Sequence, residues 1–305
     1  MSAAEAGRRR ARLSRGGSIA WCAAIYLVAA AAAFFAAGSL GGVSPLARAG
    51  VGDLAATLVV FLGSLFFDNS SIYDPYWSVA PIPIAAYWTV IALRYGEGLS
   101  IRELLVLLLV LAWAVRLTYN WLRRWRGVDH EDWRYADFRR FRRPLYWAVS
   151  FLGFHLFPTV LVFGGCLSLY AVLTAGPSAI RLLDAAAIVV TFLAIWIEAR
   201  SDRELRQFLA SGPLEGEILE TGLWAHSRHP NYFGEVLFWW GLYLFAVASH
   251  PSWWWVIIGP AAISLLFVFV SVPMMERHMV ARHPGYAELQ EGRSPFLPWF
   301  DRTGS

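Results

Sequence analysis

The stretch TGLWAHSRHPNYFGEVLFWWGLYL, residues 221–244, passes directly from a polar loop into a tryptophan-rich apolar run. Pro230 suits the first turn of a helix, where its missing N–H group would have no intrahelical partner. A helix is therefore predicted to begin at residues 229–231 and to continue through the apolar run. Its composition is typical of a membrane-spanning segment, although Glu235 places a carboxylate inside it.

The rest of the chain has the same apolar character. Of its 305 residues, 57% are hydrophobic and sixteen are tryptophan, and the mean hydropathy is +0.47. This composition excludes a soluble globular protein and indicates an all-α polytopic membrane protein. Segments of roughly 20 residues can cross the hydrocarbon, which predicts about eight spans, with seven possible. The expected spans are 19–40, 51–67, 76–93, 104–121, 147–174, 182–199, 232–248 and 253–272.

The basic residues indicate how the chain is oriented. The sequence has no lysine, and all 26 basic residues are arginine. With eight spans, 21 of them fall on one side of the membrane, in the N-terminal segment, in the two long loops and after the last span. The positive-inside rule makes this side cytoplasmic, and both termini are expected there. The net charge of +4 is thus a topology signal, and no nucleic-acid partner is expected.

The expected organisation has three parts. Residues 1–18 form a basic cytoplasmic segment, residues 19–143 an N-terminal membrane half with a hydrophobic substrate pocket, and residues 144–305 a C-terminal membrane half. The start of the chain is also similar to a signal peptide, but its apolar run of about 22 residues favours a retained span. Cys22 and Cys166 lie in apolar runs, so free buried thiols are expected and no metal site is indicated.

One candidate cluster lies where the sixth span leaves the membrane. Glu198, Asp202 and Arg206 follow one another at intervals of four residues, so they share a helix face. One interpretation is a salt-bridged ladder facing solvent. The other is a stripe that binds the ribose and the phosphates of a nucleotide.

A second cluster opens the seventh span. The free N–H groups and the positive dipole end of this helix, beside Arg228 and His229, suit an anion such as phosphate. Asn231 and Glu235 are four residues apart and could hydrogen-bond a carboxamide or hydroxyl groups. The simpler alternative for Arg228 and His229 is a basic collar at the membrane interface.

A third cluster closes the fourth span, where Arg116 and Asn120 share a face with Tyr119 nearby. An arginine at this depth needs a partner, and Asp68 or Asp74 is the expected one. Alternatively, Arg116 extends to the cytoplasmic edge of the membrane.

Together these motifs resemble a known family. The segments NSSIYDPYWSVAP, RLTYNWLRRWRG, EDWRY, GLWAHSRHPNYFGE and PGYAELQEGRSPFLPW are similar to bacterial membrane proteins related to the C-terminal domain of steroid 5-alpha-reductases. The resemblance covers roughly residues 68–299. The RHPNY stretch alone is also similar to isoprenylcysteine carboxyl methyltransferases.

The steroid-reductase resemblance implies a membrane reductase that uses NADPH, held by the C-terminal half. It assigns cofactor contacts to Asp202, Asn231 and Glu235, while Glu198 stands where those enzymes place an asparagine. The full expected cofactor-binding set is Glu198, Asp202, Arg206, Trp224, Arg228, His229, Asn231, Tyr232 and Glu235. No GxGxxG fingerprint is present, so a separate soluble-type cofactor domain is not expected.

The resemblance also implies the chemistry. Steroid reductases use a tyrosine at the position aligned with Trp113, and Tyr119 is expected to replace it as the hydrogen-bond donor. Hydride would reach the β-carbon of a conjugated C=C while this donor polarises the carbonyl oxygen. Arg116, Asp68 and Asp74 are expected to tune the donor or to supply the proton.

Three functions therefore follow from the sequence. The first is NADPH-dependent reduction of a lipid-like substrate such as a steroid, an enone or an isoprenoid. The second is methyl transfer from S-adenosylmethionine to a lipidated acceptor, and the third is non-enzymatic lipid binding. A multi-pass protein of a bacterial inner membrane, with a hydrophobic small-molecule partner and no obligate protein partner, is expected.

Overall fold

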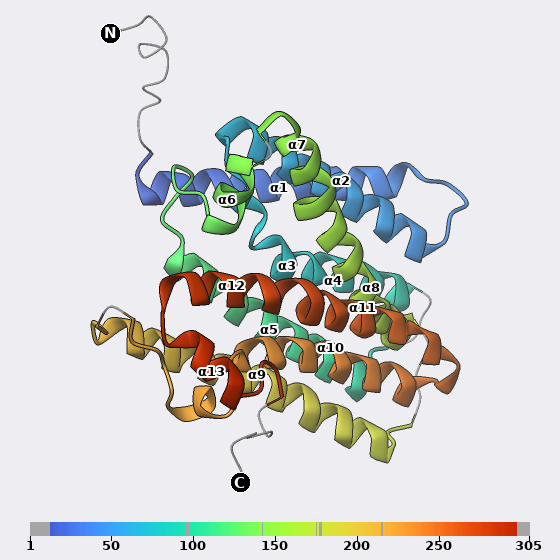
Figure 1. The fold of residues 1–305 in the computed structure, drawn as a ribbon. Coiled ribbons are helices and arrows are strands. Elements are labelled where there is room, and N and C mark those ends of the chain that lie inside the picture. Colours follow the sequence, from blue (N-terminus) through green and yellow to red (C-terminus); the bar gives the residue numbers. More distant parts are fainter. Residues whose placement is uncertain are drawn as a thin grey trace, which may run out of the picture. The chain divides into compact units, whose positions relative to one another are not determined.

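The computed structural model describes residues 13–94, 98–141, 143–174, 176, 179–214 and 216–297. Its elements are helical, and no strand forms within these ranges. The chain forms two compact units (Figure 1). Unit 1 comprises residues 1–87 and 114–163, and unit 2 comprises residues 88–113 and 164–305. Each unit therefore takes residues from both of the expected sequential halves, whose assignment to substrate and cofactor stays a prediction.

Unit 1 begins with a helical hairpin. Ser14 and Ser44 cap α1 (Arg15–Ser39) and α2 (Pro45–Phe67), because each side chain accepts a hydrogen bond from a backbone N–H three residues on. Small residues let the two helices approach closely: a Cβ on Gly52 would lie 3.0 Å from the carbonyl oxygen of Ala33. Helix α2 ends at Asp68, whose φ of 55° lies in the left-handed region.

The rest of unit 1 consists of short elements. Pro81 interrupts the third expected span, since α3 ends at Val79 and α4 starts at Pro81. The loop after the fourth expected span carries α6. The elements are the 3₁₀ turn η1 (Ser70–Tyr73), α3 (Tyr76–Val79), α4 (Pro81–Arg94) to residue 87, α5 (Ile101–Arg124) from residue 114, α6 (Trp133–Phe141), the 3₁₀ turn η2 (Arg143–Leu145), α7 (Tyr146–Val149), the π-helix η3 (Ser150–Leu156) and α8 (Phe157–Thr174) to residue 163.

Unit 2 is built around α9 and α10, which lie side by side (Figure 1). A buried ion pair joins α5 to α9, with Arg102 Nε 2.6 Å and Nη2 2.7 Å from the carboxylate of Asp184. Glycine brings α8 against α11, because a Cβ on Gly259 would collide with the backbone of Gly164. The helices after α8 are α9 (Leu182–Ala210), the 3₁₀ turn η4 (Gly222–Ala225), α10 (Pro230–Ser249), the 3₁₀ segment η5 (Pro251–Ile257), α11 (Ile258–Leu266), the π-helix η6 (Phe267–Ser271), α12 (Val272–Arg282) and α13 (Tyr286–Gly292).

The membrane character is confirmed. Seven helical segments of the described chain are long and apolar enough to cross a membrane. They match seven of the eight expected spans. The remaining expected span, residues 104–121, forms α5, whose 24 residues are long enough to cross but include Arg102, Glu103 and Arg116. The crossing of α5, on which the cytoplasmic position of both termini depends, stays a prediction.

Candidate functional site

Helix α10 begins where the sequence predicts. His229 is its N-cap and Pro230 its first residue, and the N–H of Phe233 donates to the carbonyl of His229 at 3.1 Å. The His229 ring stacks on Tyr232, with 5.3 Å between ring centroids. The first turn is thus fixed in place, with both Arg228 and His229 buried.

Glycine at position 234 controls how α10 approaches α9. A Cβ there would lie 2.8 Å from Cβ of Glu198 and 2.9 Å from the carbonyl oxygen of Ala194. Because Asn231 and Glu235 flank Gly234 on the helix surface, they are brought next to the polar end of α9. The sequence predicts that Glu198 and Asp202 share one face of a helix and that Asn231 and Glu235 share one face of the next. In the structure, the close approach at Gly234 brings these two polar faces together.

The two carboxylates on the polar face of α9 are buried. Glu198 is 4% exposed and Asp202 is 5% exposed, whereas Arg206 is half-buried. A ladder facing solvent would leave its carboxylates exposed, so the salt-bridged surface interpretation does not describe these two residues. Burying carboxylates at the polar end of a spanning helix is costly, and such residues usually mark a functional site.

Glu235 is held between two indoles. Trp113 Nε1 and Trp239 Nε1 donate to its two oxygens, each at 2.9 Å. Trp113 is fully buried and stacks on Phe238, with 4.4 Å between ring centroids. The tryptophan that replaces the tyrosine of the steroid reductases therefore acts here as a donor to a predicted cofactor residue.

The N-terminus of α10 is tied to the C-terminal segment, residues 283–297. Arg228 Nε and Nη2 contact Glu276 of α12 at 2.7 Å, and its Nη1 donates to the carbonyls of Gln290 and Arg293. The backbone N–H of Arg228 donates to the carbonyl of Ser294. Most donors of Arg228 therefore bind groups of the protein itself. We call this set of contacts, which Arg228 makes with Glu276, Gln290, Arg293 and Ser294, the clamp.

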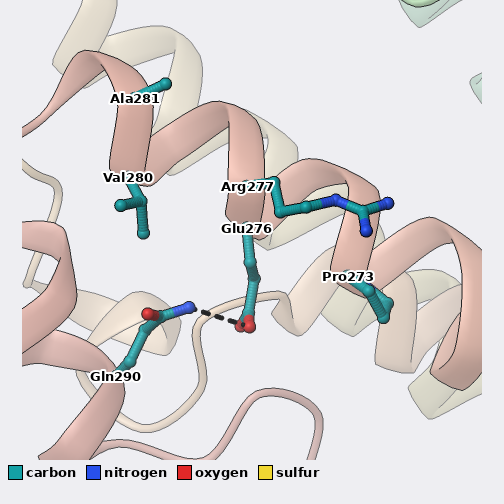
Figure 2. Close-up of a pocket in the computed structure, with 6 residues that line it drawn as sticks. All are labelled: Pro273, Glu276, Arg277, Val280, Ala281 and Gln290. Atoms are coloured by element: carbon teal, nitrogen blue, oxygen red, sulfur yellow. Dashed lines mark hydrogen bonds between the residues drawn. The ribbon is translucent and has the colours of Figure 1, made fainter.

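The clamp continues on both sides of Arg228. His229 Nε2 lies 3.4 Å from Glu276, and Gln290 donates to the other Glu276 oxygen at 3.0 Å (Figure 2). Burial, followed by the negative charge of Glu276, raises the pKa of Tyr286 in α13 above its usual range, so its phenol stays neutral.

Trp224 anchors the loop before α10. Its indole donates to the carbonyl of Ser201 on α9 at 3.0 Å, and its own carbonyl accepts from Arg293 at 2.9 Å. Gly222 adopts a positive φ of 63° beside Glu204, where a Cβ would collide with the carboxylate. The Glu204 carboxylate in turn accepts from the N–H of Leu223.

An open pocket of about 440 Å³ lies next to the clamp (Figure 2). Its lining comes from α12 and α13 and mixes apolar and polar side chains. These residues are Pro273, Glu276, Arg277, Val280, Ala281 and Gln290. None of them was predicted as a site residue.

In unit 1, the two predicted aspartates contact α6. Asp68 pairs with Arg139, and Asp74 accepts from Tyr135 at 2.6 Å and from Arg134 at 3.2 Å. Burial, and next the charge of Asp74, raise the pKa of Tyr135 above its usual range, so this phenol stays a neutral donor.

The remaining two predicted catalytic residues lie on α5. Tyr119 is 57% exposed, and the guanidinium of Arg123 lies over its ring at 5.5 Å. Arg116 is half-buried. The exposure of Tyr119 does not favour a donor role in a water-excluded site, and the catalytic assignment of these residues stays a prediction.

A buried carboxylate that the sequence analysis missed lies in α2. Asp53 is 5% exposed, and Tyr76 donates to its Oδ1 at 2.6 Å. Its Oδ2 has no hydrogen-bond partner within the described residues. Tyr73 stacks on Tyr76, with 5.0 Å between centroids, and donates to or accepts from Thr159 at 2.8 Å.

One signal in the sequence would have found this group. Asp53 lies inside the second expected span, residues 51–67, and ionisable residues within spans usually mark function. The same reasoning applies to His155 in the fifth expected span. Tyr73 and Tyr76 give no such signal, since tyrosine is common where spans begin.

The comparisons agree with the motif resemblance at the family level. A family model described as "Protein of unknown function (DUF1295)" matches residues 60–292, well over half of the chain. The "Uncharacterized protein C594.04c" of Schizosaccharomyces pombe is 26% identical over 266 residues, which cover 78% of this chain and 75% of the yeast protein. No solved structure matches the chain with significance.

Proposed function

Given that the chain belongs to the DUF1295 family, which is steroid 5-alpha-reductase-like, we propose that it is an integral-membrane reductase that uses NADPH. Its substrate is a lipid-like molecule with a conjugated C=C bond. Unit 2 contains the residues that bind the dinucleotide.

The observation that carries the proposal is the junction of α9 and α10 at Gly234. It gathers Glu198 and Asp202 with Asn231 and Glu235 at the N-terminus of a spanning helix. Three of these four residues are carboxylates, and all three are at most 5% exposed. Carboxylates and amides bind ribose hydroxyls and a carboxamide, while helix N-terminal N–H groups bind phosphate.

The residues present fit such a ligand. Asn231 Oδ1 is buried without a hydrogen-bond partner among the described residues, so it can accept from a carboxamide or a hydroxyl. Arg206 is half-buried and supplies positive charge for phosphate, whereas Arg228 positions the helix through its clamp. When bound, NADPH supplies the hydride.

Tyr76 fits the donor role better than Tyr119 does. It is buried and adjoins a carboxyl group, and a proton on Asp53 would let Asp53 donate to the Tyr76 oxygen. The hydroxyl hydrogen of Tyr76, which also donates to the backbone carbonyl of Asp53 at 3.0 Å, can then turn to a substrate carbonyl oxygen, where it stabilises the negative charge that develops after hydride attack. Asp53 thereby positions the donor.

Thermal melts of the purified protein with NADPH, NADH and S-adenosylmethionine test the proposal. A ligand at 100 times its Kd stabilises the folded state by about 2.7 kcal/mol, so NADPH is expected to raise the Tm measurably. Asn231→Ala should abolish this rise and leave the ligand-free Tm near that of the wild type. Gln207→Ala, at an exposed position on α9, is the matched control and should retain it.

Each alternative has its own outcome in this experiment. Stabilisation by S-adenosylmethionine alone would identify a methyltransferase. If none of the three ligands stabilised the protein, only the lipid-binding role would remain, and the reductase proposal would be wrong.

A further inference from the structure

The first turn of α1 lies against the end of α5. Arg15 opens α1, and its Nε donates to the carbonyl oxygen of Trp125 at 3.1 Å, while its Nη2 donates to that of Leu122 at 2.7 Å. Gly127 has a positive φ of 117°, and a Cβ there would lie 2.9 Å from Ser18 Oγ. Two separate contacts therefore join the start of α1 to the chain at and just after the end of α5.

This junction gathers four exposed arginines, which are Arg15, Arg123, Arg124 and Arg126. Within the part of the chain that the structure describes, none of the four forms an ion pair with a carboxylate. Arg15 donates to carbonyl oxygens, which carry no net charge, so its positive charge is not neutralised. Asp129, the first carboxylate after α5 in the sequence, can offset at most one of the four charges.

The arginines of α6 differ, although they belong to the same unit. Arg134 and Arg139 form ion pairs with carboxylates, and Arg140 lies 3.7 Å from Asp137. The two carboxylates that follow Asp129 in the sequence take part in these pairs, so they do not neutralise the junction. Unpaired positive charge is therefore a property of the junction and not of every arginine in this unit.

The junction lies at the edge of the membrane. Helix α1 is long and apolar enough to cross the bilayer, so its first residue, Arg15, marks one end of a span. Because Arg15 contacts α5, the end of α5 lies at the same edge, whether or not α5 itself crosses. Trp121 stacks on Trp125 there, with 4.9 Å between centroids, and the guanidinium of Arg123 lies over the ring of the exposed Tyr119. Tryptophan and tyrosine are enriched at the level of the lipid headgroups.

Unpaired guanidinium groups at this level match one class of ligand. A guanidinium presents N–H donors in a planar fork that binds two oxygens of a phosphate group. Anionic phospholipids carry this phosphate without the amine that neutralises it in zwitterionic lipids. Each basic residue beside a membrane surface raises the affinity for anionic lipid about fivefold.

We propose that the junction binds the phosphate headgroup of an anionic phospholipid. The arginine patch that binds it consists of Arg15, Arg123, Arg124 and Arg126. Arg15 holds the end of α5 in place, and the exposed guanidinium groups of the other three contact the headgroup. Leu27 and Val28, further along α1, are exposed and offer apolar surface to the acyl chains.

A simpler role for these arginines is to fix the orientation of the chain during insertion into the membrane. In that case the folded protein would gain nothing from an anionic headgroup. The two roles therefore differ in a measurable property, which is the selectivity of the folded protein for lipids. The inference does not depend on the proposed reductase function.

Native mass spectrometry of the purified protein, titrated with phosphatidylglycerol and with phosphatidylcholine, measures the Kd for each lipid. A triple glutamine variant, Arg123→Gln/Arg124→Gln/Arg126→Gln, removes three charges and keeps Arg15 for its contacts with α5. The corresponding triple lysine variant keeps the charges. Arg140→Gln is the matched control for Arg124→Gln, because Arg140 is exposed in the same unit but has a carboxylate partner.

The wild type should bind phosphatidylglycerol more tightly than phosphatidylcholine. Arg124→Gln should weaken the binding of phosphatidylglycerol about fivefold and the triple glutamine variant about a hundredfold, since each lost charge contributes about fivefold. Arg140→Gln should bind it like the wild type, and the triple lysine variant should lose less than the triple glutamine variant does. All the substituted side chains are exposed, so the Tm in detergent without added lipid should be unchanged.

Equal affinity of the wild type for the two lipids would overturn the site. Wild-type affinity of the triple glutamine variant for phosphatidylglycerol would do the same. An equal loss in the triple lysine variant, or in Arg140→Gln as in Arg124→Gln, would also contradict the proposal, because the charge of the arginine patch would then not be the cause.

Discussion

Trp113 departs from the pattern that the steroid-reductase resemblance implies, yet its indole donates to Glu235, a predicted cofactor residue. The indole of Trp113 donates to one oxygen of Glu235, and Trp239 donates to the other. Two N–H groups thus solvate a carboxylate that is 5% exposed. By sequence, Trp113 is only a mismatch to the tyrosine of the steroid reductases, whereas its hydrogen bond shows that it supports the predicted cofactor residue.

Trp113→Phe is therefore expected to destabilise the protein. The change keeps an aromatic ring against Phe238 but leaves one Glu235 oxygen without its indole donor. Loss of a hydrogen bond to a buried polar group costs about 1–3 kcal/mol, and a lower Tm in detergent measures it. Trp254→Phe is the control, because Trp254 is 66% exposed. An unchanged Tm for Trp113→Phe would contradict the role given to its indole.

At the scale of elements, the contact of α9 with α10 depends on Gly234. In Gly234→Ala, the added methyl group would lie 2.8 Å from Cβ of Glu198, so the helices must move apart. Such overpacking costs about 1–3 kcal/mol, and we expect a lower Tm together with the loss of stabilisation by NADPH. In Gly38→Ala nothing lies within 4 Å of the new methyl group, so its Tm should be unchanged. Wild-type behaviour of Gly234→Ala would show that the close approach is not required.

The clamp joins α10, α12 and α13 through Arg228. In Arg228→Gln, the side chain is expected to lose its ion pair with Glu276 and at least one contact with the carbonyls of Gln290 and Arg293. Removing one partner of a buried ion pair costs about 3–5 kcal/mol, so residues 283–297 should detach locally. Limited proteolysis should then cleave this segment faster than in the wild type. Arg277→Gln, at an exposed position on α12, should not accelerate cleavage. Equal cleavage rates in both variants would mean that other contacts hold the segment.

For the whole molecule, the decisive question is whether α5 crosses the membrane. Its arginines and Glu103 lower its apolar character, yet only a crossing at α5 places the 21 arginines on one side. Gly98→Cys and Asp129→Cys put thiols at exposed positions before and after α5. In intact cells or oriented vesicles, a membrane-impermeant maleimide should label the two from opposite sides. The native thiols, Cys22 and Cys166, are buried and should contribute little background. Labelling of both positions from one side would refute the eight-span topology.

The start of α10 could be read from the sequence, and so could the continuation of α9 beyond the sixth expected span, residues 182–199. Pro230 fixes the first turn of α10 through its own ring, and the four-residue spacing of Glu198, Asp202 and Arg206 defines one face of a continuous helix. These are local properties of the chain. Asp53 was overlooked although its place inside the second expected span is a signal in the sequence, whereas its hydrogen bond from Tyr76 is visible only in the structure.

The amino-acid sequence was enough to predict a helical membrane protein and the side that its basic loops are expected to face. Apolar length and the distribution of arginine act on each segment separately, so neither requires knowledge of its neighbours. Only the tertiary structure decided that Gly234 brings the two polar faces together, that Trp113 serves Glu235, and that the first turn of α1 lies against the end of α5. Those arrangements join residues distant in sequence, and their energies come from contacts, burial and hydrogen-bond geometry that exist only once the helices have packed.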